Sequence, residues 1–457
     1  MNKYDVLVVG SGSGMLIAAS AIASGLKTCL VDFGPMGGTC INRGCVPSKM
    51  IIYPADIVAT IREASKLGIN ATVNSIDFKW IMDRMHKLVN DDVKRQMAVV
   101  EADPNIVWHK DVGEFVSDYT MKVGDETFKA DKIFIVAGAR PAVPPVRGLD
   151  HVHYLTSDTL LDIVQQPESM LIIGGGYIAV EYGHFFSTIG TRVTILQRAS
   201  RLVPEEEPEI SDLLKGEMSQ HIEVHTNMEA TEAKENSDTK TVIAKNVETG
   251  ETEEYSAQTL LVAAGRIPNS DLLKPQNTGV EIDNRGFIKV DEYLETKKKN
   301  VWAFGDIIGK QMFKHVANYE AQIAWHNAFH DHKAKVDYSA APHAIFSHPQ
   351  IASVGLKEAE ARRQGHKLLI GVAQYKDTAQ GVARGDQKGF VKIIAEKKTG
   401  RLLGGHIIGP QASVLIQEII NALSSGDRTF APMISGLHIH PALTEVVQLA
   451  LSNIREA

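Results

Sequence analysis

Cysteine is scarce in this chain: its 457 residues include three, Cys29, Cys40 and Cys45. No uninterrupted apolar run approaches the roughly 20 residues that cross a bilayer, so we do not expect a membrane protein. The apolar segment before Gly10 is also too short for the core of a secretory signal peptide, and a cytoplasmic location is the default expectation. The formal net charge is −7 and no basic arm or stripe is visible, which argues against a nucleic-acid partner.

The residues that are abundant indicate a well-buried α/β protein. Apolar residues make up 44% of the chain and charged residues 23%, with 37 glycines spread along it. The length predicts roughly two to four domains. Cys40 and Cys45 both lie in the segment GGTCINRGCVPSK, whereas Cys29 falls in a predicted strand. Because structural disulfides are rare in the cytoplasm, the close pair indicates redox chemistry or metal binding, although two thiols are too few for a zinc site.

The N-terminal stretch YDVLVVGSGSGMLIAASAIASGLKTCLVDF has the pattern of a β-α-β unit. It predicts a strand over 5–9, a glycine turn, a helix over 15–24 and a strand over 27–31. Gly10 and Gly12 let the backbone pass close to a pyrophosphate at the helix N-terminus, and Asp32 ends the second strand, where an acid binds a ribose hydroxyl. The third glycine position of the pattern is Met15, so we expect looser helix–strand packing there. The unit predicts a dinucleotide site; the alternative is a plain structural turn.

The same pattern returns in SMLIIGGGYIAVEYGHFFSTIGTRVTILQR, with strands expected over 170–173 and 192–196. Its glycine turn contains Gly174 and Gly176, so one chain carries two dinucleotide sites. Where an acid would select NADH, the chain has Gln197, followed by Arg198 and Arg201. Two guanidinium groups without a competing carboxylate suit the 2′-phosphate of NADPH. If both arginines are only solvated surface residues, NADH is used instead.

Several motifs, in order along the chain, resemble those of the FAD-dependent pyridine nucleotide–disulfide oxidoreductases. The family includes glutathione, mycothione, bis-γ-glutamylcystine and mercuric reductases and dihydrolipoamide dehydrogenase. The cysteine segment is similar to its active-site segment, and the other matching segments are IVAGARP, LVAAGRIPN, VWAFGDI and HIHPALTE. The resemblance implies an α/β fold with two Rossmann-like dinucleotide-binding domains, one for FAD and one for NAD(P), and a C-terminal α+β dimerisation domain. It covers essentially the whole chain.

The resemblance also assigns roles to individual residues. Cys45 becomes the flavin-side thiolate and Cys40 the thiol that attacks a substrate disulfide, while His440, oriented by Glu445, protonates the leaving thiolate. The other catalytic residues that it implies are Lys49 and Glu181, which pair beside the reactive nitrogen of the flavin. The expected FAD-binding residues are Gly10, Gly12, Gly14, Asp32, Gly38, Thr39, Lys49, Gly113, Gly138 and Asp306. The expected NADP-binding residues are Gly174, Gly176, Tyr177, Arg198, Arg201 and Gly265.

Each of these residues also has a simpler interpretation. His440 could be an ordinary buried histidine, one of 17 in the chain, and Lys49 with Glu181 an ordinary surface ion pair. Core packing is a rival role for Tyr177. Arg43, beside the cysteines, could attract an anionic thiol or be an exposed charge. We expect helix N-terminal geometry to lower the pKa of Cys45, because an apparent helix follows it.

The resemblance further predicts how the chain is divided and assembled. We expect 1–148 with 272–336 to form the FAD domain, 149–271 the NAD(P) domain, and 337–457 the dimerisation domain. In the family this last domain forms a two-fold dimer whose histidine serves the disulfide of the other subunit. The apolar helix face of Leu415, Ile416, Ile419 and Ile420 could lie at that interface or in an internal core.

These observations predict a flavoenzyme that uses NADPH, with NADH possible, to reduce a low-molecular-weight disulfide through Cys40 and Cys45. Dihydrolipoyl dehydrogenase is the main alternative, because it shares the Pro-Ser-Lys ending of the cysteine segment. A mercuric reductase is disfavoured, since the chain ends LSNIREA without the C-terminal cysteine pair that binds the metal. A non-catalytic FAD-binding subunit and an oxidase-like or quinone-reducing flavoprotein are the remaining alternatives. Expected partners are thus a small disulfide and a second copy of the chain, with no resident metal.

Overall fold

The first sheet of the computed structural model, which describes residues 2–457, has seven strands. Their bounds are β1 Asn2–Val9, β2 Thr28–Val31, β3 Ile106–His109, β4 Gly113–Ser117, β5 Thr120–Val123, β6 Glu126–Ile135 and β16 Val301–Ala303. Strands β3, β2, β1 and β6 pair in parallel, with β16 also parallel to β6, and β5 and β4 extend the sheet antiparallel. The sheet therefore joins two segments that are far apart in the sequence.

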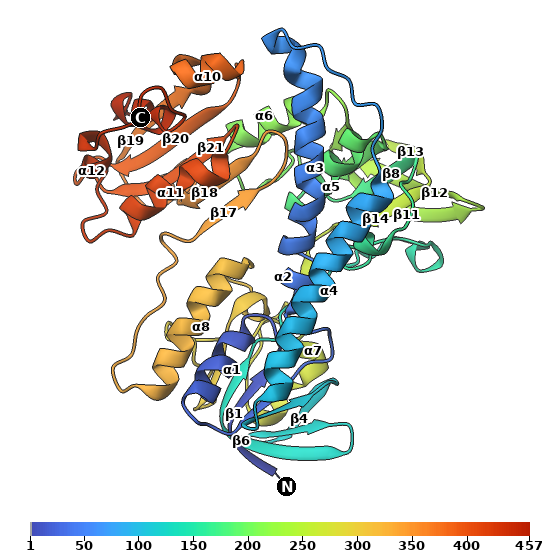
Figure 1. Ribbon diagram of the computed structural model, residues 1–457, viewed down its shortest axis with the longest axis vertical. Coiled ribbons are helices and arrows are strands. Elements are labelled where there is room, and N and C mark those ends of the chain that lie inside the picture. Colours follow the sequence, from blue (N-terminus) through green and yellow to red (C-terminus); the bar gives the residue numbers. More distant parts are fainter. Residues whose placement is uncertain (1) are drawn as a thin grey trace.

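Two long helices connect this first sheet with the rest of the molecule. The helices of this part are α1 Gly14–Ala23, α2 Gly38–Asn42, α3 Cys45–Glu63, α4 Phe78–Ala102, α7 Ser270–Leu273 and α8 Lys314–Phe329. Asp77 caps α4, because its side chain accepts a hydrogen bond of 2.8 Å from the Trp80 backbone N–H. Helices α3 and α4 run side by side away from the first sheet (Figure 1), and their buried faces pack in the hydrophobic cluster of the second sheet.

The second part of the molecule contains a parallel sheet and an antiparallel sheet. The parallel strands, in spatial order, are β10 Glu223–Thr226, β9 Arg192–Gln197, β8 Ser169–Ile173 and β14 Thr259–Val262. The antiparallel strands are β11 Met228–Asn236, β12 Thr239–Asn246 and β13 Thr252–Ala257, and the helices are α5 Tyr177–Ile189 and α6 Pro208–Met218. A two-stranded ribbon, β7 Ala139–Pro141 with β15 Arg266–Pro268, marks where the chain enters and leaves this part.

The third part is an antiparallel sheet covered by helices. Its spatial order is β17 Pro342–Ile345, β18 Ile351–Gly355, β21 Leu402–Ile408, β20 Phe390–Glu396, β19 Leu368–Gln374 and β22 Arg455–Glu456. Its helices are α9 Glu358–Arg363, α10 Ala379–Arg384, α11 Ala412–Leu423, α12 Ala431–Ser435 and α13 Glu445–Ser452. Leu415, Ile416 and Ile419 lie in its hydrophobic core and Ile420 packs against that core, so this helix face serves mainly as internal core.

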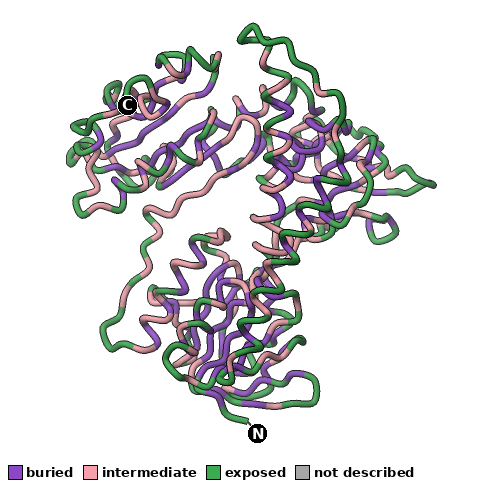
Figure 2. Tube along the Cα trace, in the orientation of Figure 1, coloured by how far each residue is buried: buried purple, intermediate pink, exposed green. Residues whose placement is uncertain are grey.

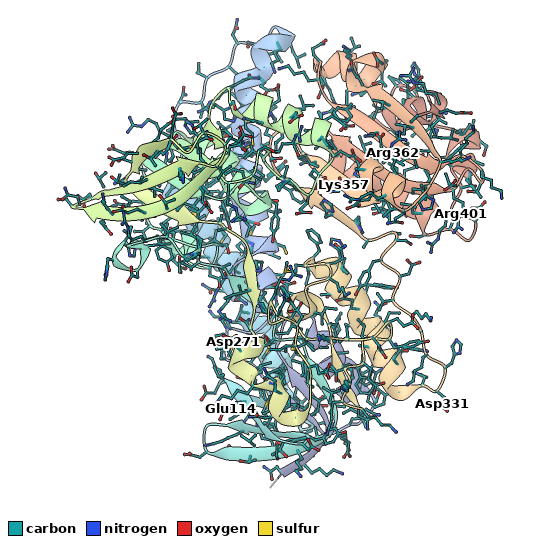
Figure 3. All side chains as sticks on the ribbon, turned by 180° about the vertical axis from the view of Figure 1, so that it is seen from behind. Glu114, Asp271, Asp331, Lys357, Arg362 and Arg401 are labelled. Atoms are coloured by element: carbon teal, nitrogen blue, oxygen red, sulfur yellow. The ribbon has the colours of Figure 1, made fainter. Side chains whose placement is uncertain are left out.

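Each part has a buried centre and an exposed rim (Figure 2). Charges of both signs lie on the surface, as the labelled residues Glu114, Asp271, Asp331, Lys357, Arg362 and Arg401 illustrate (Figure 3). Some of these charges are paired, such as Arg140 with Asp271 at 2.8 Å and Arg362 with Glu358 at 2.9 Å. Within residues 2–457, no helix combines the length and the apolar character that a bilayer crossing requires.

The predicted fold class is confirmed: two parallel-sheet units of the dinucleotide-binding type precede a C-terminal α+β unit. Most expected element boundaries shift by one to three residues. The largest consequence concerns α3, which was expected to follow Cys45 but begins at Cys45 itself. The predicted domain boundaries stay a prediction.

Candidate active site

The two cysteines of the GGTCINRGCVPSK segment lie on consecutive helices. Cys40 is inside the short α2, and Cys45 is the first residue of α3, with Gly44 as its N-cap. Both are free thiols in the structure, and the Cys40 thiol donates a hydrogen bond to the Cys45 sulfur. An added Cβ at Gly44 would lie 3.0 Å from the Thr39 carbonyl oxygen, so the tight turn between the helices favours glycine.

The environments of the two sulfurs separate their acidities. The hydrogen bond from Cys40 lowers the pKa of Cys45 to about 7, and the positive charge of Lys49 adds to this effect against the opposing influence of burial. The pKa of Cys40 is raised, first because its proton is held in that hydrogen bond and then by burial. The first proton that the dithiol loses therefore comes from Cys45, which leaves a thiolate at the start of α3.

Lys49 is held one turn along α3 by a buried carboxylate from the second part of the molecule. Its ammonium lies 2.6 Å from Glu181 Oε2, and Glu181 is 5% exposed. The other oxygen, Oε1, accepts a hydrogen bond of 2.9 Å from the Phe346 backbone N–H, and the Phe346 ring lies 4.7 Å from the ammonium. The pair is not an ordinary surface ion pair, because Glu181 is buried and both of its carboxylate oxygens have a partner.

We expect the ionisation of Cys45 to depend on Lys49. In the reduced wild type, the thiolate should form as the pH rises through about 7. Lys49→Met removes the cation that favours the thiolate, so the pKa should rise and the thiolate should form only at higher pH. The measurement is a pH titration of the long-wavelength thiolate–flavin absorption. Lys66→Met, which removes an exposed lysine paired with Glu63 beyond the far end of α3, should leave the titration unchanged. If the pKa of Cys45 is unchanged in Lys49→Met, the positive charge of Lys49 does not affect the ionisation of Cys45.

A cavity of about 1020 Å³ runs from these cysteines across the edge of the first sheet. The structure brings many of the predicted residues to its wall: Gly10, Gly12, Asp32, Gly38, Thr39, Cys40, Cys45, Lys49, Gly113, Gly138, Tyr177, Glu181 and Asp306. The cavity is large enough for a dinucleotide. The thiols lie at one part of its wall and the first glycine turn at another.

The first glycine turn is shaped for close backbone contact. Gly10 has φ +111°, and an added Cβ there would lie 2.3 Å from the Val136 carbonyl oxygen, so no other residue fits. Gly12 faces open space in the cavity. Helix α1 makes its close approach to the sheet at Gly14, where an added Cβ would lie 2.8 Å from Val8 Cγ1. This contact at Gly14 lies one residue before Met15, where looser packing was expected.

Asp32 lies beside the glycine turn, at the end of β2. Its Oδ2 accepts a hydrogen bond of 2.5 Å from the Ser11 N–H and its Oδ1 one of 2.8 Å from the Gly34 N–H. These bonds fix the carboxylate at the cavity wall, where a ribose would lie next to the turn.

The wall of the cavity also contains polar groups that need a partner. Asp306 lies 3.6 Å from Arg266 Nε, which is longer than a hydrogen bond, and burial raises the pKa of this carboxyl. Among residues 2–457, buried Arg266 Nε has no hydrogen-bond partner. Together with the open glycine turn, this pair fits a polyhydroxylated chain such as the ribityl group of FAD.

Tyr177 follows the second glycine turn and lines the same cavity. It is 38% exposed, and its ring lies 6.4 Å from that of Phe313. Phe313 in turn stacks on His343 at 5.3 Å. The ring is therefore at the cavity wall, which sets aside the alternative of pure core packing.

The second glycine turn lies at the end of β8, outside the wall of the large cavity. Gly174 has φ +113°, and an added Cβ would meet the Ala263 carbonyl oxygen at 2.3 Å, whereas Gly176 faces open space. Gly265, with φ +115°, precedes β15 and also has open space beside it. The two turns therefore match: Gly174 is closely packed like Gly10, and Gly176 faces open space like Gly12.

The expectation that Arg198 and Arg201 have no competing carboxylate is wrong. Arg201 Nε lies 2.8 Å from Asp212, and Arg198 lies 3.5 Å from Glu229. Sequence reasoning missed both acids because they come from α6 and β11, outside the β-α-β pattern. The side chain of Arg201 is 44% exposed and that of Arg198 is 76% exposed. Such exposed ion pairs are weak enough to exchange for a phosphate.

His440 and Glu445 meet each other but not the cysteines of the same chain. His440 Nδ1 donates a hydrogen bond of 2.7 Å to Glu445 Oε1, which lowers the pKa of Glu445, and Glu445 Oε2 accepts one of 2.9 Å from the Ala442 N–H. The His440 side chain is 73% exposed, so it is not an ordinary buried histidine. Neither residue lines the cavity.

Two cavity residues were missed by sequence reasoning. Arg266 directly follows Gly265 in LVAAGRIPN, so the motif contained the signal. Lys314, the first residue of α8, lines the cavity and donates a 3.1 Å hydrogen bond to Ser13 Oγ. Burial lowers its pKa, and no motif marked it. Arg43 lines the cavity as well, 3.5 Å from Asp158.

The sequence matches known families over nearly its whole length. Residues 4–322 match the pyridine nucleotide-disulphide oxidoreductase family, and residues 341–451 match the dimerisation domain of the same family.

Similar proteins include mycothione reductase of Mycobacterium tuberculosis, which is 37% identical over all of both chains. Dihydrolipoyl dehydrogenase of Chlamydia muridarum is 33% identical, over 98% of this chain and 96% of its own. Among solved structures, a Cu(II) complex of the HOCl-induced flavoprotein disulfide reductase RclA from Escherichia coli has a TM-score of 0.87 at 26% identity, over 99% of both chains. The chain therefore belongs to the pyridine nucleotide-disulphide oxidoreductases and is a flavoprotein disulfide oxidoreductase that acts on sulfur groups with FAD and a pyridine nucleotide.

Proposed function

We propose that the enzyme reduces a low-molecular-weight disulfide with NADPH through Cys40 and Cys45. The observation that carries this proposal is the pair of thiols, Cys40 in α2 and Cys45 at the start of α3, on the wall of a dinucleotide-sized cavity. When bound, FAD supplies the transfer of two electrons from the nicotinamide to the cysteine pair. The residues proposed to hold FAD are Gly10, Gly12, Gly14, Asp32, Gly38, Thr39, Lys49, Gly113, Gly138 and Asp306, to which Arg266 is added.

In the proposed reaction, the Cys40 sulfur attacks one sulfur of the substrate disulfide and releases the first thiolate. His440 of the partner subunit takes the Cys40 proton and gives it to that thiolate, and Glu445 orients its ring. The Cys45 thiolate then attacks the Cys40 sulfur of the mixed disulfide. This step reforms the Cys40–Cys45 bond and releases the second thiolate, which takes a proton from the solvent.

The use of a histidine from a second subunit requires a homodimer, which two features of the chain support. The chain has the family's dimerisation domain, and Leu437 and Ile439, which precede His440, are 104% and 78% exposed. Large apolar side chains exposed beside a candidate catalytic histidine are what a subunit interface would bury. A cytoplasmic location remains a prediction.

NADPH is proposed because Gln197 stands where an acid would select NADH. Gln197 packs against Gly175 of the second turn, and Arg198 and Arg201 follow it. Gly174, Gly176, Tyr177 and Gly265 complete the proposed nucleotide site.

Removing both arginines should weaken the use of NADPH selectively. We expect Arg198→Ala/Arg201→Ala to lower kcat/KM for NADPH by about 10- to 100-fold, because charge-assisted hydrogen bonds to the 2′-phosphate are lost, with little change for NADH. Arg192→Ala, at the exposed start of β9, is the control. If the wild type gives a higher kcat/KM with NADH, the proposed preference is wrong.

Substrate class is tested by steady-state assays with lipoamide, glutathione disulfide, bis-γ-glutamylcystine, mycothione, coenzyme A disulfide and mercuric ion. The similarity to mycothione reductase favours a low-molecular-weight thiol disulfide as the best acceptor. The similarity to dihydrolipoyl dehydrogenase keeps lipoamide as the second candidate, and highest kcat/KM with lipoamide would establish it. Mercuric ion as acceptor tests the mercuric reductase alternative.

A further inference from the structure

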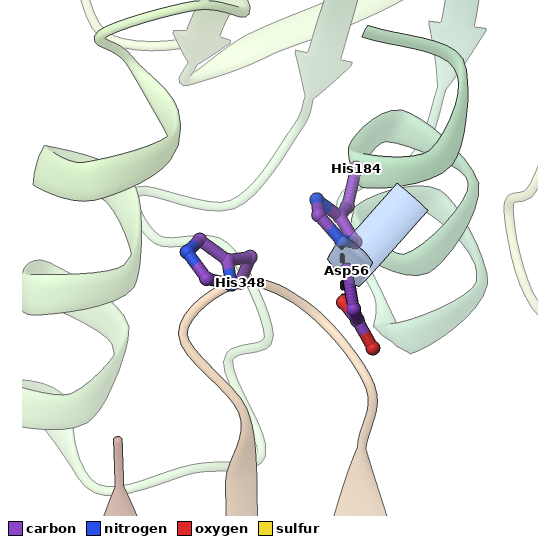
Figure 4. Close-up of side chains that lie close together, drawn as sticks. All are labelled: Asp56, His184 and His348. Atoms are coloured by element: carbon purple, nitrogen blue, oxygen red, sulfur yellow. Dashed lines mark hydrogen bonds and ion pairs between the residues drawn. The ribbon is translucent and has the colours of Figure 1, made fainter. Parts of the chain in front are cut away.

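A cluster of metal-ligand residues lies at the junction of the three parts, away from the large cavity. It consists of Asp56 on α3, His184 on α5 and His348 in the turn between β17 and β18 (Figure 4). Among residues 2–457, these three form the one group of histidines, cysteines and acids whose ligand atoms all lie within 4.8 Å of one another. None of them lines the cavity, and Asp56 follows Cys45 by 11 residues, about 16 Å along the helix.

Two of the three ligand atoms already have the spacing of a metal site. His184 Nε2 lies 2.9 Å from Asp56 Oδ1. Ligands of a tetrahedral zinc at about 2 Å from the ion lie roughly 3.3 Å from each other, so the pair needs little adjustment. The third ligand, His348, is 38% exposed, and rotation of its side chain would bring it closer.

Neighbouring side chains hold both imidazole rings in place. Thr188 Oγ1 lies 3.2 Å from His184 Nδ1, and a hydroxyl can accept the proton there when Nε2 binds a metal. His348 Nε2 lies 3.1 Å from Glu63 Oε1, and Glu63 is two turns beyond Asp56 on α3. The two rings stack at 5.4 Å with an angle of 14° between their planes. His184 is 1% exposed, so the surrounding residues fix the position of this ligand.

We propose that Asp56, His184 and His348 form a binding site for a divalent transition-metal ion of the zinc class. Two imidazoles and one carboxylate suit such ions, whereas Mg²⁺ and Ca²⁺ prefer oxygen ligands alone. The bound ion would connect α3, α5 and the β17–β18 turn, which belong to the first, second and third parts of the molecule. It would therefore stabilise their packing without entering the disulfide chemistry.

The test is a Zn²⁺ titration of the oxidised holoenzyme after removal of affinity tags and treatment with a chelator. Oxidation converts Cys40 and Cys45 to a disulfide, so these thiols cannot bind the ion. We expect about one Zn²⁺ per subunit, with release of a proton and a higher Tm. The double variant Asp56→Asn/His348→Gln should bind this equivalent at least about 100-fold more weakly and lose the rise in Tm.

A matched control separates the site from any histidine–carboxylate pair. His225 lies 2.8 Å from Glu223, much as His184 lies from Asp56, but it belongs to no group of three in the described residues. His225→Gln should therefore bind Zn²⁺ as the wild type does. Turnover of the metal-free double variant should match the wild type, which shows that it folds. Absence of a stoichiometric equivalent in the wild type, or equal binding by the double variant, would show that the cluster is only a hydrogen-bonded contact.

Discussion

Cys45→Ser is expected to abolish disulfide reduction, with a fall in kcat/KM of more than about 1000-fold, because no second sulfur remains to close the disulfide. The variant should also lose the long-wavelength absorption of the two-electron-reduced enzyme, since that band requires a thiolate beside the flavin. The interaction with Cys40 and the positive charge of Lys49 lower the pKa of Cys45, which favours the negative charge on this sulfur. Anaerobic reduction followed by absorption spectroscopy measures the band, and steady-state assays measure the rate.

The control for this variant is the third cysteine. Cys29 is fully buried in β2 and does not line the cavity, so Cys29→Ala should keep both the activity and the band. A long-wavelength band that persists in Cys45→Ser would contradict the assignment of Cys45 as the flavin-side thiolate.

His440→Ala is the second substitution with a large expected effect. We expect it to lower the rate of disulfide reduction by about 100- to 10,000-fold, because the leaving thiolate loses its proton donor. The loss should be smaller for substrates whose thiols have a low pKa, since those leave readily without protonation. His438→Gln is the matched control. His438 lies two residues before His440 and is also paired with a carboxylate, that of Glu418 at 2.8 Å.

A mixed dimer tests which cysteine pair His440 serves. One subunit carries Cys45→Ser and the other His440→Ala, and two different tags allow purification of the mixed species. If His440 acts on the partner's disulfide, one of the two sites is complete and about half of the wild-type activity should return. If it acted within its own chain, both sites would be defective and the mixed dimer would be inactive.

The local parts of the candidate site could be predicted from the sequence, because they depend on short segments. The glycine turns at Gly10 and Gly174 need φ values near +110°, and the patterns around them reveal both. The cysteine segment likewise contains its own geometry, with a helix that begins at Cys45. Lys49 and Glu181 are 132 residues apart, and resemblance to a family was needed to pair them.

The parts that could not be predicted arise where distant segments meet. Asp212 and Glu229 lie beside the two arginines because α6 and β11 pack there, and no local pattern contains that contact. Lys314 enters the cavity because α8 begins at its wall. The cluster of Asp56, His184 and His348 joins three segments that are each separated by more than 120 residues.

The most direct measurement counts thiols before and after anaerobic reduction of the purified holoenzyme by NADPH. An enzyme that passes electrons through a Cys40–Cys45 disulfide should gain about two titratable thiols per flavin, and mass spectrometry of the alkylated protein should locate them at these two residues. A flavin that is fully reduced while no thiols are gained would contradict the disulfide mechanism and would favour an oxidase-like or quinone-reducing enzyme.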